Sequence, residues 1–109
     1  MTSKASYYQE PSELGIPILK LFIQNPTGEC RQTIYVMERQ YGWGFNLSSA
    51  VKYLWRLGIK TADTQSDLAK AIQYLNWELE APRKPLSADT RYAIETAIEM
   101  CRELQQNQI

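Results

Sequence analysis

The sequence predicts an all-α protein, a compact bundle of about four to five helices with a central helical hairpin. Apolar residues recur at three- and four-residue spacing in several stretches, and the period-two alternation of half-buried strands is absent. Glycine and proline separate these stretches. With 109 residues, of which 44% are hydrophobic, the chain is long enough for one domain with its own core. We expect an N-terminal arm at residues 1–11 and a single helical domain at 12–106.

Proline and glycine divide the first half of the chain. Pro17 fits only near a first helical turn, so a first helix is expected at residues 17–24, before a turn at 25–28. A second helix is expected at residues 29–41, and Gly42 and Gly44 would end it, with Trp43 between them free to fold inward. Its apolar stripe consists of Cys30, Ile34, Met37 and Tyr41.

The third and fourth helices form the expected hairpin. Asn46 is a good N-cap for the third helix, with Phe45 before it, and Gly58 would end that helix. Asp63 or Thr64 would cap the fourth helix. The core positions expected on the two helices are Leu47, Ala50, Val51, Leu54, Leu57, Leu68, Ala71, Ile72, Leu75 and Leu79.

A last helix is expected from Ser87, its N-cap, to about residue 105. Its inward positions are Ile94, Ala97, Ile98, Cys101 and Leu104. The N-terminus has no apolar signal-peptide core, so Cys30 and Cys101 are expected as small buried hydrophobic residues in a reducing compartment. No apolar stretch is long enough to span a membrane. We therefore expect a cytoplasmic protein.

Composition excludes several function classes. Twelve basic and twelve acidic residues cancel, so no global field attracts nucleic acid or a membrane surface. The chain has no histidine, the usual general base and the commonest transition-metal ligand. It also has no Walker A loop, no GxSxG motif and no clustered acidic repeat that would hold a metal. No metal site is predicted, and any electropositive site must be local.

A row of basic residues marks the third helix. Lys52 and Arg56 are four residues apart and share a face, and Lys60 follows just past Gly58. No acidic residue occurs between Phe45 and residue 61. Like charges at this spacing repel by a few tenths of a kcal/mol (~0.2–0.5), so an acid from another helix or an anionic ligand must offset them.

The fourth helix would bring further candidate ligand residues beside this row. The candidates for phosphate are Lys52, Arg56, Lys60 and Lys70, and those for orienting or stacking a base are Asn46, Tyr53, Trp55, Asp67 and Tyr74. An ion pair between Asp67 and Lys52 or Arg56 explains the same pattern without a ligand. The sequence leaves both interpretations open.

The motif F-N-L-x-x-A-V-K-Y-L-W-R-x-G-x-K at residues 45–60, followed by D-L-x-K-A-I-x-Y-L at 67–75, resembles a family of small bacteriophage proteins. That family is catalogued as a domain of unknown function and is often labelled nucleotide kinase. The matching positions are Phe45, Asn46, Val51, Lys52, Tyr53, Leu54, Arg56, Gly58, Lys60, Asp67, Leu68, Lys70, Ala71, Tyr74 and Leu75. The resemblance implies nucleotide binding in the cytoplasm of a phage host and leaves catalysis open.

Two functions follow as hypotheses. The first is a phage-type small helical protein that binds a nucleotide or nucleotide-like anion, with nucleotide kinase-like activity left open. The alternative is a non-catalytic interaction module that inhibits or adapts a host protein or sequesters a signalling nucleotide. Neutral net charge disfavours DNA as a partner. No cofactor is identified, although Mg²⁺ is compatible with a nucleotide ligand, and self-association through an apolar face stays open.

Overall fold

The computed structural model describes residues 10–59 and 63–107, and five helices lie within them. They are α2 (Ile16–Leu19), α3 (Cys30–Tyr41), α4 (Phe45–Trp55), α5 (Thr64–Glu80) and α6 (Ala88–Asn107). The described residues contain no strand, so the predicted all-α class is confirmed. None of their helices combines the length and the apolar character needed to cross a membrane. Most of the expected N-terminal arm lies outside the described residues.

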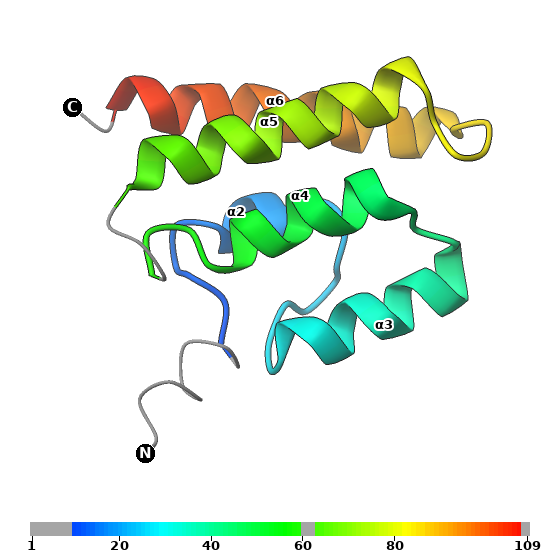
Figure 1. The fold of residues 1–109 in the computed structure, drawn as a ribbon, viewed down its shortest axis with the longest axis horizontal. Coiled ribbons are helices and arrows are strands. Elements are labelled where there is room, and N and C mark those ends of the chain that lie inside the picture. The colour runs from blue at the N-terminus through cyan, green and yellow to red at the C-terminus, as the bar shows by residue number, and fades with distance from the viewer. Residues whose placement is uncertain (1–9, 60–62, 108–109) are drawn as a thin grey trace.

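The helices are arranged around α4 and α5, which run antiparallel and form the predicted central hairpin (Figure 1). Figure 1 shows α5 and α6 as a long antiparallel pair, with α4 along the other side of α5. The short α2 packs against α4 and α6, and α3 contacts α4 at the edge of the bundle. One face of α4 therefore meets α5 while another faces α3.

The core is built from the apolar stripes expected on the last three helices. Burying one such side chain contributes roughly 1.5–3 kcal/mol, so these stripes hold α4, α5 and α6 together. The predicted core residues that are buried are Leu47, Ala50, Val51, Leu54, Leu57, Leu68, Ala71, Leu75, Ile94, Ala97, Ile98 and Cys101. Trp43 also folds inward, as expected, and is 8% exposed.

Two N-cap residues act as the sequence predicts. The carboxylate of Asp63 accepts a hydrogen bond from Ser66 N–H at 2.9 Å and caps α5. The hydroxyl of Ser87 accepts one from Thr90 N–H at 3.1 Å at the start of α6. Gly58 follows α4 with a φ of +73°, a conformation that is strained for residues with a Cβ.

Three details differ from the expectations. The first helix is shorter than residues 17–24, because after Leu19 the chain winds more tightly: Phe22 N–H donates to Leu19 O at 2.9 Å. This winding brings the ring of Phe22 to Trp43. α3 has no fully buried residue, and Tyr41 at its end is 64% exposed. α6 continues to Asn107, slightly beyond its expected end.

The predicted N-cap of α4 is wrong. The helix begins at Phe45 with Gly44 as its N-cap, and Ser48 N–H donates to Gly44 O at 3.0 Å. Asn46 lies inside the first turn, where its side chain is a hydrogen-bonding partner of the carboxyl group of Glu78. The amide of Asn46 is therefore used to join α4 to α5, and no side chain caps α4.

Candidate functional site

The antiparallel hairpin brings four of the predicted ligand residues together. The rings of Tyr53 on α4 and Tyr74 on α5 stack with centroids 5.9 Å apart and an interplanar angle of 14°. The guanidinium carbon of Arg56 lies 4.6 Å from the centroid of Tyr53, and the ammonium of Lys70 lies 5.4 Å from it. Two cations from different helices thus share one aromatic ring, which attracts each of them through its quadrupole.

Two more rings extend this cluster toward the beginning of α4. Phe45 and Trp77 each pack edge-to-face on Tyr74, with centroids 5.6 Å and 5.5 Å away. Phe45 is 72% exposed and Trp77 is 45% exposed. We call this surface the aromatic–basic strip; its residues are Phe45, Tyr53, Arg56, Lys70, Tyr74 and Trp77. Phe45 and Trp77 form its aromatic end, and Arg56 and Lys70 form its basic end.

Phe45 and Trp77 are absent from the predicted stacking residues. The sequence predicts Phe45 as the residue before the cap and as a motif position, because the predicted N-cap, Asn46, lies two residues after the observed one. Trp77 follows Tyr74 by three residues on α5, so helical spacing alone places it on the same face. That spacing was the available signal for Trp77.

Lys52 lies on the side of α4 that faces α3. It is exposed, and its charge and that of Arg56 both act on the Cys30 thiol of α3. Burial raises the pKa of Cys30 to about 11, and the two cations oppose this rise. Arg56 is half-buried, and its Nε atom is buried without a hydrogen-bond partner. Arg56 thus carries a buried, unsatisfied donor at the basic end of the strip.

Asp67, on α5, is buried against the turn that follows α4. It is 3% exposed, and its carboxylate accepts a hydrogen bond from Gly58 N–H, with a nitrogen–oxygen distance of 3.4 Å. Among the described residues it forms no ion pair with Lys52 or Arg56. Asp67 therefore braces the turn after α4, and its proposed role in orienting a ligand stays a prediction.

The remaining predicted residues lie elsewhere. Asn46 contacts Glu78 near the start of α4, away from the basic end of the strip. Trp55 is 1% exposed in the core, so its expected role as a stacking surface is wrong: packing of α4 turns it inward. Lys60 lies outside the described residues. The strip therefore contains Tyr53, Tyr74 and two of the four predicted cations.

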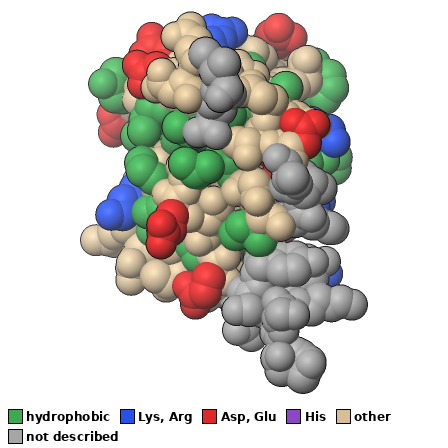
Figure 2. All heavy atoms as spheres, turned by 90° about the vertical axis from the view of Figure 1, so that its left-hand side faces the viewer, with side chains coloured by type: hydrophobic (Ala, Val, Ile, Leu, Met, Phe, Trp, Pro, Cys, Tyr) green, Lys and Arg blue, Asp and Glu red, His purple; other side chains and the backbone are tan. Residues whose placement is uncertain are grey.

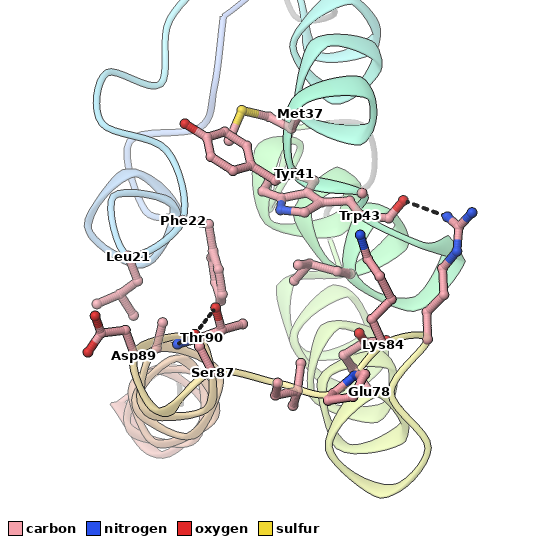
Figure 3. A pocket seen from close by; sticks show the side chains of 16 residues that line it. Leu21, Phe22, Met37, Tyr41, Trp43, Glu78, Lys84, Ser87, Asp89 and Thr90 are labelled. Atoms are coloured by element: carbon pink, nitrogen blue, oxygen red, sulfur yellow. Dashed lines mark hydrogen bonds between the residues drawn. The ribbon is translucent and has the colours of Figure 1, made fainter.

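A cavity of about 610 Å³ opens on another side of the molecule (Figure 3). Its walls come from the turn after α2, the end of α3, the linker to α4 and the first turn of α4, the end of α5, the turn between α5 and α6, and the beginning of α6. No sequence motif could reveal it, because these segments are far apart in the chain. The side chains that decide its chemistry are Phe22, Tyr41, Trp43, Glu78, Arg83 and Lys84.

Glu78 is the buried acid of this cavity, with 6% exposure. Burial raises its pKa, and hydrogen bonds from the backbone N–H of Arg83 and the side chain of Asn46 oppose that rise. The guanidinium of Arg83 donates to the carbonyl oxygen of Trp43 at 3.3 Å, as the dashed line in Figure 3 shows. Arg83 thus ties the turn after α5 to the linker before α4.

Charge is mixed over the face in Figure 2. The described atoms there show acidic and basic side chains around a band of hydrophobic ones, with no stripe of one sign. The described residues also contain no group of three or more cysteine, aspartate or glutamate side chains placed to hold a metal ion. Arg56 and Lys70 of the aromatic–basic strip, together with Lys52, are the predicted phosphate-binding cations that the structure places near the hairpin.

Comparison with known proteins yields no match to a family model, to a curated protein sequence or to a solved structure. The resemblance to the phage family stays a prediction, carried by the motif residues alone. Function must therefore be argued from the geometry of this chain.

Proposed function

We propose that the aromatic–basic strip binds a nucleotide or nucleotide-like anion. The observation that carries this proposal is the pair of cations on Tyr53, Arg56 at 4.6 Å and Lys70 at 5.4 Å. Neither cation has a carboxylate partner among the described residues. Phosphate oxygens would supply the missing negative charge and would accept hydrogen bonds from both side chains.

The aromatic end of the strip would hold the base. Tyr53 and Tyr74 stack on each other, so the rings with the most exposed surface are Phe45 and Trp77. Stacking of a base on an aromatic side chain contributes roughly 1–3 kcal/mol and tolerates any base. Phe45 and Arg56 are about 16 Å apart along α4, at 1.5 Å per residue. An extended nucleotide would lie along the strip with its phosphates toward Arg56.

Lys52 would add charge from the α3 side, one helical turn before Arg56. The roles expected for Lys60, Asp67 and Asn46 stay predictions. The proposal concerns binding in the cytoplasm, that of the host if the protein is phage-encoded. Turnover by a kinase-like reaction would depend on positioning and charge neutralisation, which begin with binding.

A thermal-shift screen tests this proposal. Purified protein is heated with mono-, di-, tri- and cyclic nucleotides, with and without Mg²⁺. A ligand at a hundred times its dissociation constant stabilises the folded state by about 2.7 kcal/mol, which raises the midpoint visibly. We expect one nucleotide class to raise it, and Arg56→Ala to remove the shift. Arg91→Ala, on the exposed surface of α6, is the matched control.

A second function is favoured by the same exposed rings. Phe45 and Trp77 form an aromatic patch, and such patches are frequent anchors of protein interfaces. The alternative is therefore a non-catalytic module that inhibits or adapts a host protein. A nucleotide shift that survives Phe45→Ala and Arg56→Ala would remove the strip as the nucleotide site and favour this alternative. Sedimentation of the purified protein would show whether the partner is a second copy.

A further inference from the structure

The cavity in Figure 3 is separate from the aromatic–basic strip and has the dimensions of a small-molecule site. Its volume of about 610 Å³ lies within the range of ligand pockets, roughly 300–1,000 Å³. Four helices and the turn at 81–87 contribute to its walls. A ligand in this cavity would contact segments that are distant in the sequence and that the fold already brings together.

One side of the cavity is aromatic. Phe22 and Trp43 meet edge-to-face, with centroids 6.5 Å apart and an interplanar angle of 88°. Figure 3 shows Tyr41 beside Trp43, and the ring of Phe22 contacts that of Trp43. Trp43 is held by packing, since it is 8% exposed, and by Arg83 on its carbonyl. These rigid rings offer flat surfaces to a planar molecule.

Glu78 supplies hydrogen-bond acceptors from the α5 side of the cavity. An ionised carboxylate has about four acceptor positions, and the protein fills two of them, through Arg83 N–H and the side chain of Asn46. The other lone pairs can accept N–H groups from a ligand. Two adjacent N–H donors on one edge of a ring match a carboxylate in the bidentate manner of an arginine fork.

The charges around the cavity balance. Lys84 has no hydrogen-bond or ion-pair partner among the described residues, and its ammonium lies against Gly42. Arg83 is engaged with Trp43, and Asp89 is exposed at the start of α6. Two acids and two bases line the walls, so the cavity as a whole favours a neutral ligand over a strong anion.

From these contacts we infer that the cavity is a second ligand site, for a neutral planar heteroaromatic molecule with two adjacent N–H donors, the edge that guanine presents. Because the rings of Trp43 and Phe22 lie at 88° to each other, one of them contacts a flat face of the molecule and the other contacts its edge, and Glu78 accepts its two N–H groups. This site is independent of the nucleotide proposal, because the strip recognises negative charge and lies on other surfaces of α4 and α5.

The test uses guanosine, with adenosine as the matched ligand, and follows amide and indole NMR signals of the full chain. Adenine places one amino group beside a ring acceptor, so it presents only one donor to Glu78 along that edge. We expect guanosine to shift the signals of Gly42 and Trp43 and to bind at least tenfold more tightly than adenosine. Equal binding of the two nucleosides, or binding of neither, would overturn the inference.

Glu78→Gln is the decisive variant, because a glutamine can still accept a hydrogen bond from Arg83 N–H but turns an amino group toward the ligand donors. We expect it to weaken guanosine binding at least tenfold while the native spectrum is kept. Should Glu78→Gln not fold, Tyr41→Ala replaces it: this side chain is 64% exposed, and its loss should weaken guanosine several-fold. Unchanged guanosine affinity in the folded variant contradicts the site.

Arg56→Ala separates this inference from the proposed function. It should leave guanosine binding unchanged while it weakens nucleotide binding at the strip. Guanosine binding that is lost in Arg56→Ala and kept in Glu78→Gln would assign the nucleoside to the strip and overturn the cavity site. If Arg56→Ala loses the nucleotide-induced thermal shift and still binds guanosine, both the strip and the cavity site are supported.

Discussion

The guanidinium of Arg56 lies over the ring of Tyr53, with 4.6 Å between the guanidinium carbon and the ring centroid. Tyr53 in turn stacks on Tyr74 of the neighbouring helix, and Lys70 from that helix reaches the same ring. The contact therefore couples the two helices of the hairpin and concentrates positive charge at their junction. An anion bound there would meet both cations without a change in the backbone.

Arg56→Ala should reduce nucleotide affinity by about 1.5–3 kcal/mol, the contribution of a hydrogen bond to a charged group. This corresponds to roughly ten- to hundredfold in the dissociation constant. The nucleotide affinity of Arg56→Lys should lie between those of the wild-type protein and Arg56→Ala, because lysine keeps the charge and loses the planar fork. Calorimetric titration measures all three proteins, with Arg91→Ala as the control. Wild-type affinity in Arg56→Ala would exclude the strip as the phosphate site.

Gly15→Ala should destabilise the fold through a close approach of two backbones. A Cβ at residue 15 would overlap the carbonyl oxygen of Leu54 on α4, and no flexible side chain can yield there. Forcing atoms into a packed site costs about 1–3 kcal/mol. Urea unfolding measures the loss. Gly28→Ala is the control, since Gly28 has a φ of +79° but no atoms within 4 Å of an added Cβ. A smaller loss for Gly15→Ala than for Gly28→Ala would contradict the steric account.

The local features of the fold follow from the sequence. Asp63 and Ser87 begin helices because their side chains accept hydrogen bonds from nearby backbone N–H groups, and Gly58 takes a positive φ in the turn after α4 because it has no Cβ. The core stripes follow for the same reason, since helical spacing determines which residues share a face. The meeting of Tyr53 and Tyr74 could be expected once the two helices were placed antiparallel.

Features that depend on distant segments were missed. Asn46 is a good capping residue, yet its amide is a partner of Glu78, and the N-cap of α4 is Gly44, two residues earlier. Trp55 belongs to an aromatic-rich helix whose packing decides which ring is buried. The cavity combines residues of several segments that have no common motif. Sequence spacing within one helix cannot determine any of these relationships.

The stability of the wild-type protein relative to Glu78→Gln should fall as the pH rises above the ordinary pKa of glutamate. Burial raises the pKa of Glu78, so the folded state binds the proton more tightly than the unfolded chain does. Where the folded state holds more protons, the free energy of unfolding decreases with pH. Urea unfolding of both proteins between about pH 4 and 7 measures this difference. A free-energy difference between wild type and Glu78→Gln that instead grows with pH would contradict the assignment.

Lys52→Ala should raise the pKa of Cys30 further. Burial already raises that pKa to about 11, and the charge of Lys52 is the largest effect opposing the rise. The rate of thiol alkylation as a function of pH reports this value, because the thiolate is the reactive form. Cys101 is fully buried with a pKa raised to about 12, so it should react more slowly than Cys30 in the same protein. An unchanged alkylation profile would show that Lys52 does not face α3.

Phe45→Ala and Trp77→Ala should both lower nucleotide affinity, and Phe45→Ala should leave the stability nearly unchanged. Phe45 is 72% exposed, so its truncation removes little buried surface, whereas Trp77 is 45% exposed and its truncation also removes the buried area that packs on Tyr74. If they carry the base, each substitution should weaken binding by about 1–3 kcal/mol. Thermal unfolding and calorimetric titration measure the two effects separately. Tyr92→Ala is the matched control, because Tyr92 on α6 is 69% exposed and lies outside the strip. Equal affinities of Tyr92→Ala and the two strip variants would mean that the base does not stack on Phe45 or Trp77, and these rings would then be candidates for a protein partner.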